Sequence, residues 1–339
     1  MGEWRRAGVI VNPMAGASEA SSLKSSRIAV EQLGIRVVMT GDGRLGRDAF
    51  GGWAGDLQTR SIGNLSAREQ THALTRWVAD QGVEVLIVSG GDGTLADAAQ
   101  ALAERKSQIP ILGLGSGSTN VGQLVTCRAE RAGELDPCQL ETWSVHCLLA
   151  EVNQCELGIA FNDVVLGRTV VGTIDGIRRD LDASARLQGR AMPAAPRSIG
   201  SNASRVTRIA GEQRVTVASG EEVACVVVGL AESAFFGKAV TGGACLASAA
   251  GLPAGCIVAD VPLVQIEIDK SELSAMPPIA SKFVSLSGDQ CIEVEGVEGA
   301  CLCVDGNARH IAEKADRMRV TVRCNAVVGV RSRKDLRST

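Results

Sequence analysis

The sequence has no tyrosine and only three histidines, and its cysteines are not spaced like metal ligands. Its three histidines, His72, His146 and His310, lie far apart, and none of the eleven cysteines belongs to a Cys-x-x-Cys pair. The closest cysteines, Cys301 and Cys303, would share one face of a strand. This spacing argues against a zinc motif and favours buried free thiols in a reducing cytoplasm.

The sequence also lacks a long apolar run and a large net charge. No segment approaches the roughly 20 apolar residues of a membrane helix, and the run at residues 8–11 is too short for the core of a signal peptide. A formal net charge of -3 argues against a nucleic-acid partner held by bulk electrostatics. We therefore expect a cytoplasmic protein without a membrane span that acts on small molecules. The sequence leaves the oligomeric state open, a homo-oligomer included.

The first part of the chain alternates short apolar runs with helical patterns. Ser66 is expected to cap a helix, with Glu69 completing a capping box. Strand, helix and strand at this spacing predict a parallel sheet covered on both faces, and we place this α/β domain at residues 1–125. The predicted strands lie at 8–11, 35–40, 83–88 and 109–114, and the predicted helices at 23–33, from 66 onward and at 95–104.

After about residue 125 the pattern changes to apolar runs separated by turns such as Ser219-Gly220. This alternation predicts a β-rich domain, built as a sandwich, over residues 126–339. Residues 178–208 differ, because they are rich in Arg, Ala, Ser and Pro and have few large apolar side chains. We interpret them as a mobile surface insertion.

The strongest chemical signal is a segment that leaves a buried strand and enters a helix, Gly90-Gly91-Asp92-Gly93-Thr94. Glycines let the backbone approach a phosphate closely, and the helix N-terminus offers free N–H groups and a positive dipole end. In such an anion site Asp92 could accept a proton from an attacking hydroxyl, or hold Mg²⁺ directly or through water. On local chemistry alone, a tight turn that only closes the loop explains the segment equally well.

A second glycine-rich loop follows the next strand. Two such loops after neighbouring parallel strands meet at the carboxyl edge of the sheet, where ligands bind in open α/β folds. This favours a phosphate site over a plain turn. The loop comprises Gly115, Ser116, Gly117, Ser118, Thr119 and Asn120.

Two other nucleotide sites fit less well. The second loop misses the dinucleotide fingerprint, because Ser118 stands where its third glycine belongs. A dehydrogenase would also need an acidic residue about 20 residues further on, and no convincing candidate is present. A Walker loop is excluded because Ala239 follows Gly237-Lys238.

Together with Val11-Asn12-Pro13-Met14-Ala15-Gly16, the Gly-Gly-Asp-Gly-Thr segment resembles the superfamily that unites NAD kinases with diacylglycerol and sphingosine kinases. More closely, the chain resembles the ATP-NAD kinase family in its AcoX-like branch. Further matching stretches begin at Met39, Val165 and Gly251, so the resemblance spans most of the chain.

This resemblance implies a Rossmann-like N-terminal domain, a C-terminal β-sandwich domain, and ATP with Mg²⁺ as the phosphoryl donor. Asp92 takes the place of the family's catalytic aspartate. Asn162 and Asp163 fall where NAD kinases have an Asn-Glu pair that helps to bind the dinucleotide. Asp305-Gly306 resembles another Asp-Gly of the superfamily, which adds Asp305 to Asn162 and Asp163 as an expected acceptor contact; an ordinary hairpin turn is the alternative. The expected nucleotide and phosphate contacts are Asn12, Gly90, Gly91, Gly93, Thr94, Gly115, Ser116, Gly117, Ser118, Thr119 and Asn120.

The chain also departs from NAD kinases. They typically carry a Thr-Gly-Ser-Thr-Ala-Tyr stretch in the second domain, and the corresponding region here, around Thr241-Gly242-Gly243, has no tyrosine. The Ser118-Thr119-Asn120 end of the second loop leans toward the lipid-kinase form. Both departures weaken the case for NAD as the acceptor, but they do not affect the expectation of phosphoryl transfer.

We therefore expect a kinase that transfers a phosphoryl group to a hydroxyl, with the adenosine 2′-hydroxyl of NAD as the leading acceptor. Another small-metabolite or lipid hydroxyl is the alternative within this class, and a non-catalytic nucleotide-binding sensor is the rival outside it. The sequence does not separate ATP from polyphosphate as the donor.

Overall fold

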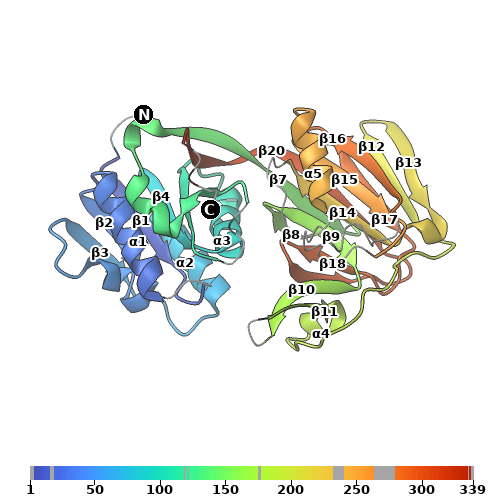
Figure 1. Cartoon of the computed structure of the whole chain (residues 1–339), viewed down its shortest axis with the longest axis horizontal. Helices are drawn as coiled ribbons and strands as arrows, with labels where there is room; N and C mark the ends of the chain where they lie inside the picture. Colours follow the sequence, from blue (N-terminus) through green and yellow to red (C-terminus); the bar gives the residue numbers. More distant parts are fainter. Residues whose placement is uncertain are drawn as a thin grey trace, which may run out of the picture. The chain divides into compact units, whose positions relative to one another are not determined.

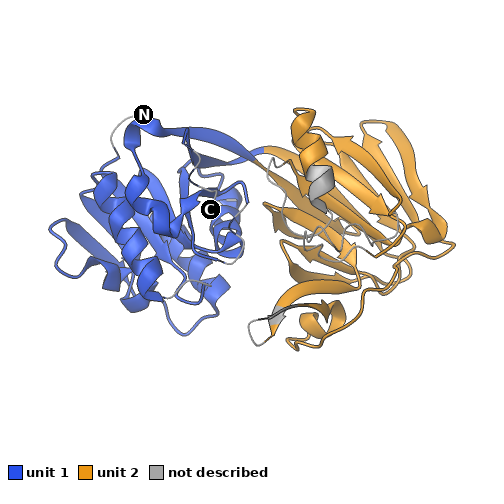
Figure 2. Ribbon diagram, viewed as in Figure 1, with its two compact units in different colours: residues 1–145, 325–339 blue, residues 146–324 orange. Residues whose placement is uncertain are grey.

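The structure is a computed structural model, and it describes residues 4–15, 19–117, 120, 122–174, 177–231, 240–262, 279–334 and 336. The chain divides into two compact units (Figure 2): unit 1 comprises residues 1–145 and 325–339, and unit 2 comprises residues 146–324. Two strands, β7 (Leu140–Val152) and β20 (Arg317–Ser332), cross this division. The first unit thus extends past the boundary expected at residue 125 and includes the C-terminal segment.

Unit 1 is built on a largely parallel sheet in the strand order β20-β5-β4-β1-β2-β3 (Figure 1). The four central pairings are parallel, and they place the carboxyl ends of β1, β4 and β5 at one edge. β6 (Val125–Arg128) pairs with β5, and β20 joins β5 through Gly329 and Ile111. The remaining strands are β1 (Arg6–Val11), β2 (Val37–Gly41), β3 (Asp56–Arg60), β4 (Val85–Gly90) and β5 (Ile111–Gly115).

Helices cover both faces of this sheet. Val30 of α1 belongs to the same core cluster as Val9 of β1. On the alternate face, Val78 of α2 lies so close to the β1 backbone that only glycine fits at position 8. Successive side chains of a strand point to opposite faces, which is why one buried strand packs against helices on both sides. The helices are α1 (Glu19–Gln32), α2 (Ala67–Ala79) and α3 (Asp92–Glu104), and the short 3-10 turns are η1 (Gly43–Leu45), η2 (Arg47–Phe50), η3 (Ala129–Glu134) and η4 (Pro137–Gln139).

Unit 2 is a β-sandwich. In its first sheet β13, β12, β17 and β20 are neighbours, and β7 pairs with β20 and β8; its second sheet has the order β16-β15-β14-β9-β18-β19. The core lies between the sheets, where Val320 of β20 and Val206 of β12 belong to one cluster with Val228 of β14 and Leu302 of β18. The strands are β8 (Cys155–Ala160), β9 (Asp163–Gly167), β12 (Arg205–Ala210), β13 (Gln213–Ser219), β14 (Cys225–Leu230), β15 (Ala254–Ala259), β16 (Ser281–Leu286), β17 (Cys291–Glu295), β18 (Cys301–Val304) and β19 (Asn307–Ile311).

A separate antiparallel hairpin and two helices complete unit 2. The hairpin joins β10 (Thr169–Ile174) to β11 (Ile177–Asp182), and α4 (Ala183–Leu187) follows it. The helix α5 (Val240–Ala249) packs on β14 and β15, and the turn η5 (Gly220–Glu222) precedes β14.

The expected fold, an N-terminal α/β part followed by a β-rich part, is confirmed. The interval 178–208 contains more structure than its composition suggests. It carries most of β11, all of α4 and the start of β12, and its Ile199 is buried in the sandwich core. The mobility expected of it stays a prediction.

Candidate functional site

The first glycine loop lies where β4 ends and α3 begins. Gly91 is the N-cap residue in an extended conformation, no side chain caps the helix there, and Asp92 occupies its first turn. Gly93 follows as an exposed residue, whereas Thr94 is buried. The backbone N–H groups at a helix start have no partner within the helix, so this turn has the polarity of an anion site.

Asn12 joins the end of β1 to this turn. Its backbone N–H donates to the Ser89 carbonyl at 2.9 Å. Its side-chain Nδ2 donates to Thr94 Oγ1 at 2.7 Å, and its Oδ1 accepts from the Met14 N–H at 3.0 Å. The Asn12 and Thr94 side chains thus hold each other in place, and the sequence prediction that groups Asn12 with the first loop agrees with this geometry.

The second glycine loop closes directly on the first. The Ser116 N–H donates to the Gly90 carbonyl at 2.9 Å. A Cβ on Gly117 would lie 2.7 Å from the Cα of Gly91, so position 117 needs glycine for the two backbones to touch; a Cβ on Gly91 would be a tight contact, 3.3 Å from the Cα of Gly117. Asn120, with a left-handed φ of 54°, holds the loop through Oδ1, which accepts from the Gly117 N–H at 2.7 Å. Ser118 and Thr119 lie outside the described residues.

Asp92 ties the two loops together. Its Oδ1 accepts a hydrogen bond from the Gly122 N–H at 3.0 Å, and its side chain remains partly exposed. Gly122 therefore joins the site through its backbone, and sequence reasoning missed it because a backbone N–H leaves no mark in the choice of side chain. Unit 1 thus brings together Asn12, Gly90, Gly91, Asp92, Gly93, Thr94, Gly115, Ser116, Gly117 and Asn120.

The chemistry of this site fits a magnesium-bound polyphosphate. Mg²⁺ commonly uses one or two carboxylates and takes its other ligands from water and substrate phosphates, and Asp92 supplies one partly exposed carboxylate at the loop edge. Among the described residues, no group of three His, Cys, Asp or Glu side chains could hold a metal ion.

In unit 2, Asp305 forms a clamp on the segment that enters β9. Asp305 and Gly306 both have positive φ, 46° and 74°, and make the tight turn between β18 and β19. The Asp305 carboxylate accepts from the Phe161 N–H at 2.8 Å through Oδ2, and from the Asn162 and Asp163 N–H groups at 2.8 and 3.0 Å through Oδ1. The structure thus brings Asn162, Asp163 and Asp305 together, with the Asp305 oxygens directed at backbone.

Opposing effects act on the Asp305 carboxyl. Burial is the largest cause that raises the pKa of Asp305, and the negative charge of Asp163 is the next. The three N–H donors favour the ionised form and lower the pKa, but the net result is a pKa of about 7. The clamp is therefore sensitive to protonation near neutral pH. Its effect on Asn162 and Asp163 is to fix their backbone, which leaves a side-chain role for this pair as a prediction.

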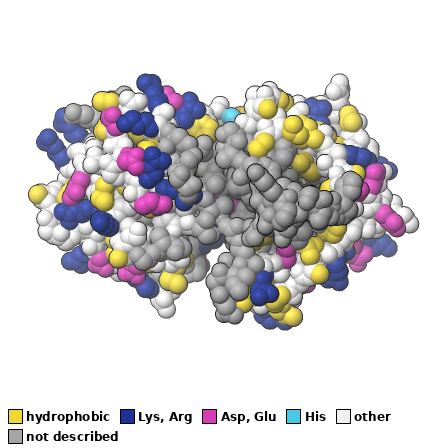
Figure 3. All heavy atoms as spheres, in the orientation of Figure 1, with side chains coloured by type: hydrophobic (Ala, Val, Ile, Leu, Met, Phe, Trp, Pro, Cys, Tyr) yellow, Lys and Arg dark blue, Asp and Glu magenta, His cyan; other side chains and the backbone are white. Residues whose placement is uncertain are grey.

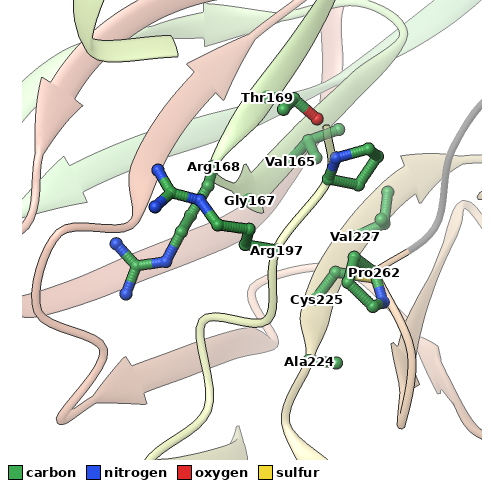
Figure 4. Close-up of a pocket in the computed structure, with 10 residues that line it drawn as sticks. Val165, Gly167, Arg168, Thr169, Arg197, Ala224, Cys225, Val227 and Pro262 are labelled. Atoms are coloured by element: carbon green, nitrogen blue, oxygen red, sulfur yellow. The ribbon is translucent and has the colours of Figure 1, made fainter. Parts of the chain in front are cut away.

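A small hollow in unit 2 is lined by part of the stretch that begins at Val165 and, from the interval 178–208, by Pro196 and Arg197. Figure 4 shows the side chains of Arg168 and Arg197 beside one another at this hollow. Arg168 Nε donates to the Ser198 carbonyl at 2.9 Å and its Nη2 to the Glu298 carbonyl at 3.1 Å, so this guanidinium braces two loops. The hollow adds no group to the candidate site.

The described surface agrees with the charge balance of the sequence. In Figure 3, Lys and Arg side chains are interspersed with Asp and Glu side chains over the described part of the visible face. In the described part of the chain, every helix is too short or too polar to cross a membrane. The cysteines there are free thiols, seven of them buried, as expected: Cys127, Cys147, Cys225, Cys256, Cys291, Cys301 and Cys303.

Two solved structures share the fold of this chain. A putative diacylglycerol kinase from Bacillus anthracis aligns with a TM-score of 0.55 and 14% identity, over 98% of this chain and 99% of that one. Yeast NADH kinase, solved with NADH, aligns with a TM-score of 0.52 and 11% identity, over 99% of this chain and 85% of that one. At these identities the likeness establishes the fold alone, which this chain shares with both of these proteins.

The sequence comparison is more specific. Residues 7–127 match the family model of the ATP-NAD kinase N-terminal domain, a range that contains both glycine loops. An uncharacterized protein of Archaeoglobus fulgidus is 29% identical over 304 residues, which cover 89% of this chain and 91% of that protein. Residues 7–127 therefore match an ATP-NAD kinase N-terminal domain, which bears out the family recognition for this part of the chain. Its AcoX-like branch stays a prediction.

Proposed function

We propose that this protein is a kinase that transfers a phosphoryl group from Mg·ATP to an alcohol, with the adenosine 2′-hydroxyl of NAD as the acceptor. The family match supports kinase chemistry in general. The observation that carries the proposal is the contact of two glycine loops around Asp92. Gly91 and Gly117 meet backbone to backbone, and Asp92 joins them through Gly122.

The loop pair supplies what a polyphosphate needs. The start of α3 presents backbone N–H groups next to the exposed Gly93, where no side chain obstructs a close approach. Ser116 adds a second feature: its hydroxyl is buried, and among the described residues it finds no hydrogen-bond partner. A buried polar group without a partner costs free energy, and a phosphate oxygen would satisfy it.

Asp92 is the group with chemistry to do. A site that only bound nucleotide would gain nothing from a carboxylate beside phosphates, since like charges repel. As a base, Asp92 would orient the acceptor hydroxyl and take its proton as the new phosphate ester forms. Mg²⁺, bound with ATP, would neutralise charge on the transferring group, and Asp92 is the described residue of the loop pair that would hold it.

The proposed acceptor contacts are Asn162 and Asp163 in unit 2. Asp305 fixes their backbone through three hydrogen bonds, which is the kind of support that holds a binding group in one orientation. A carboxylate such as Asp163 suits a ligand rich in hydroxyl groups, because it accepts strong hydrogen bonds from them. This favours a sugar-bearing acceptor such as NAD over a purely apolar one.

The test is to incubate the purified protein with Mg·ATP and NAD and to identify the product by mass. NADP should form in step with ADP. Parallel reactions replace NAD with diacylglycerol vesicles or a small polyol. Phosphorylation of one of these in place of NAD would support kinase activity but show that NAD is not the acceptor. An absence of ATP turnover with every acceptor would contradict the whole proposal.

A further inference from the structure

Two thiols that the proposed kinase chemistry does not use contact each other on β18. Cys301 and Cys303 are buried, and the Cys303 thiol donates to Cys301 Sγ at 3.6 Å. Their neighbour Leu302 points into the sandwich core, so the pair lies on the outer face of its sheet. There it packs with Val170 and Leu181 of the hairpin β10–β11.

This pair differs electrostatically from the other buried thiols. The hydrogen bond from Cys303 lowers the pKa of Cys301 despite its burial. Burial, as the largest cause, raises the pKa of Cys147, in the same unit, to about 12. The thiolate is the reactive form of cysteine, so Cys301 is more nucleophilic than the buried Cys147.

The hairpin β10–β11 covers the pair without being part of either sandwich sheet. It forms a two-stranded sheet of its own, without ladder pairing to either sheet of the sandwich in the described part of the chain. Val170 and Leu181 hold it over the pair through side-chain packing, so local opening of this packing would expose the two sulfurs. Val165, which pairs with Cys303 and belongs to the same cluster, also lines the small hollow in Figure 4.

Joining the two sulfurs would strain β18. Residues i and i+2 of a strand have Cα atoms about 6.6 Å apart at the usual rise, near the upper limit of about 6.8 Å for a disulfide. The pairing of β18 with β19 already shifts register between Leu302 and Cys303. Asp305, whose carboxylate clamps the Phe161, Asn162 and Asp163 backbone, follows Cys303 by two residues.

We propose that Cys301 and Cys303 form an oxidant-sensitive dithiol that a peroxide closes to a disulfide, and that this closure loosens the Asp305 clamp. The Cys301 thiolate attacks one peroxide oxygen, the O–O bond breaks, and hydroxide leaves and takes up the proton that the Cys301 thiol had released. The Cys303 sulfur then attacks the resulting Cys301 sulfenic acid. The S–S bond forms, the S–O bond breaks, and water leaves with the Cys303 proton. Sulfur is oxidised and peroxide is reduced to two water molecules.

The experiment uses the full chain with its exposed cysteines, Cys138, Cys155 and Cys324, first blocked by iodoacetamide on the native protein. Hydrogen peroxide is then added, and peptide mass mapping follows each cysteine. The peptide that holds Cys301 and Cys303 should lose two hydrogens without joining another peptide. Cys147→Ser should react like the wild type, and Cys303→Ser should stop at a sulfenic acid on Cys301 that a 1,3-diketone traps.

Amide hydrogen exchange reads out the clamp independently of kinase activity. Oxidation should speed exchange at Phe161, Asn162 and Asp163 by roughly tenfold, as loss of about one hydrogen bond implies. The Val227 amide in β14 should not change, and dithiothreitol should reverse the effect. Oxidation of Cys147 as fast as the pair, or sulfinic acid in place of the disulfide, would overturn the dithiol. A disulfide with unchanged exchange at these three amides would overturn its link to the clamp.

Discussion

Replacing Gly93 with alanine tests whether this position is glycine because a phosphate approaches its backbone or because the fold itself requires glycine there. No atom of the described residues, outside its own helix turn, lies within 4 Å of a Cβ placed at Gly93. Alanine also restricts the unfolded chain and favours the helix, which stabilises a protein by about 0.4–1 kcal/mol where the backbone conformation suits it. We therefore expect the free energy of unfolding of Gly93→Ala to stay equal or to rise slightly.

The same methyl group should weaken ATP binding. If a phosphate oxygen approaches the backbone at this exposed turn, the added carbon keeps it from the N–H groups of α3. Loss of one charge-assisted hydrogen bond is worth about 1.5–3 kcal/mol, so the KM for ATP should rise roughly tenfold to hundredfold.

Urea unfolding and steady-state kinetics measure the two effects on one preparation. Gly51→Ala is the matched control, because Gly51 has a negative φ of -55° and, among the described residues, also has nothing within 4 Å of its Cβ. Like Gly93→Ala it should leave the free energy of unfolding equal or slightly higher, but it should not change the KM for ATP. A Gly93→Ala protein that is stable and keeps the wild-type KM for ATP would refute a phosphate at this turn.

Two further predictions concern unit 2. Asp163→Ala should raise the KM for the acceptor about tenfold to hundredfold, because one charged hydrogen-bond partner is lost. The KM for ATP should stay near wild type, and so should both KM values of the exposed control Asp260→Ala. Equal changes in both KM values of Asp163→Ala would remove Asp163 from the acceptor site. Asp305 has a pKa raised by burial to about 7 in the folded protein, so its contribution to stability is fully present below about pH 4 and is lost as the pH rises through 7. The free energy of unfolding, measured in urea, should therefore fall for the wild type relative to Asp305→Asn as the pH rises over this range. A difference between the two proteins that stays constant from pH 4 to 8 would contradict the raised pKa.

The α/β part of the fold was predictable because its strands are short, wholly apolar runs between helices. The six residues of β4 are all buried, and Ser66 and Glu69 form the capping box that their spacing indicated. β3 escaped prediction because most of its Asp56–Arg60 side chains are exposed, and a polar edge strand carries no apolar signal. The hairpin β10–β11 escaped because the Arg-rich composition around it favoured a surface loop.

The candidate site was predictable where side chains or glycines have a positional reason. Gly117 is a glycine because its backbone touches that of Gly91, and Asn12 reaches Thr94 across two strand ends. The roles of Gly122 and Phe161 could not be read from the sequence, because both contribute a backbone N–H. The three hydrogen bonds of Asp305 join residues far apart in the chain, and only the folded sandwich brings them together.

The most direct test of phosphoryl transfer at the paired loops is the turnover of Asp92→Asn. Asparagine keeps an oxygen that can accept from the Gly122 N–H, so the contact between the loops and the thermal midpoint should both survive. It removes the charge and the ability to take a proton, and general-base assistance is worth about 10²–10⁴ in rate, or roughly 3–5 kcal/mol. We expect kcat with saturating Mg·ATP and acceptor to fall by that factor. A folded Asp92→Asn protein with near wild-type kcat would contradict the account.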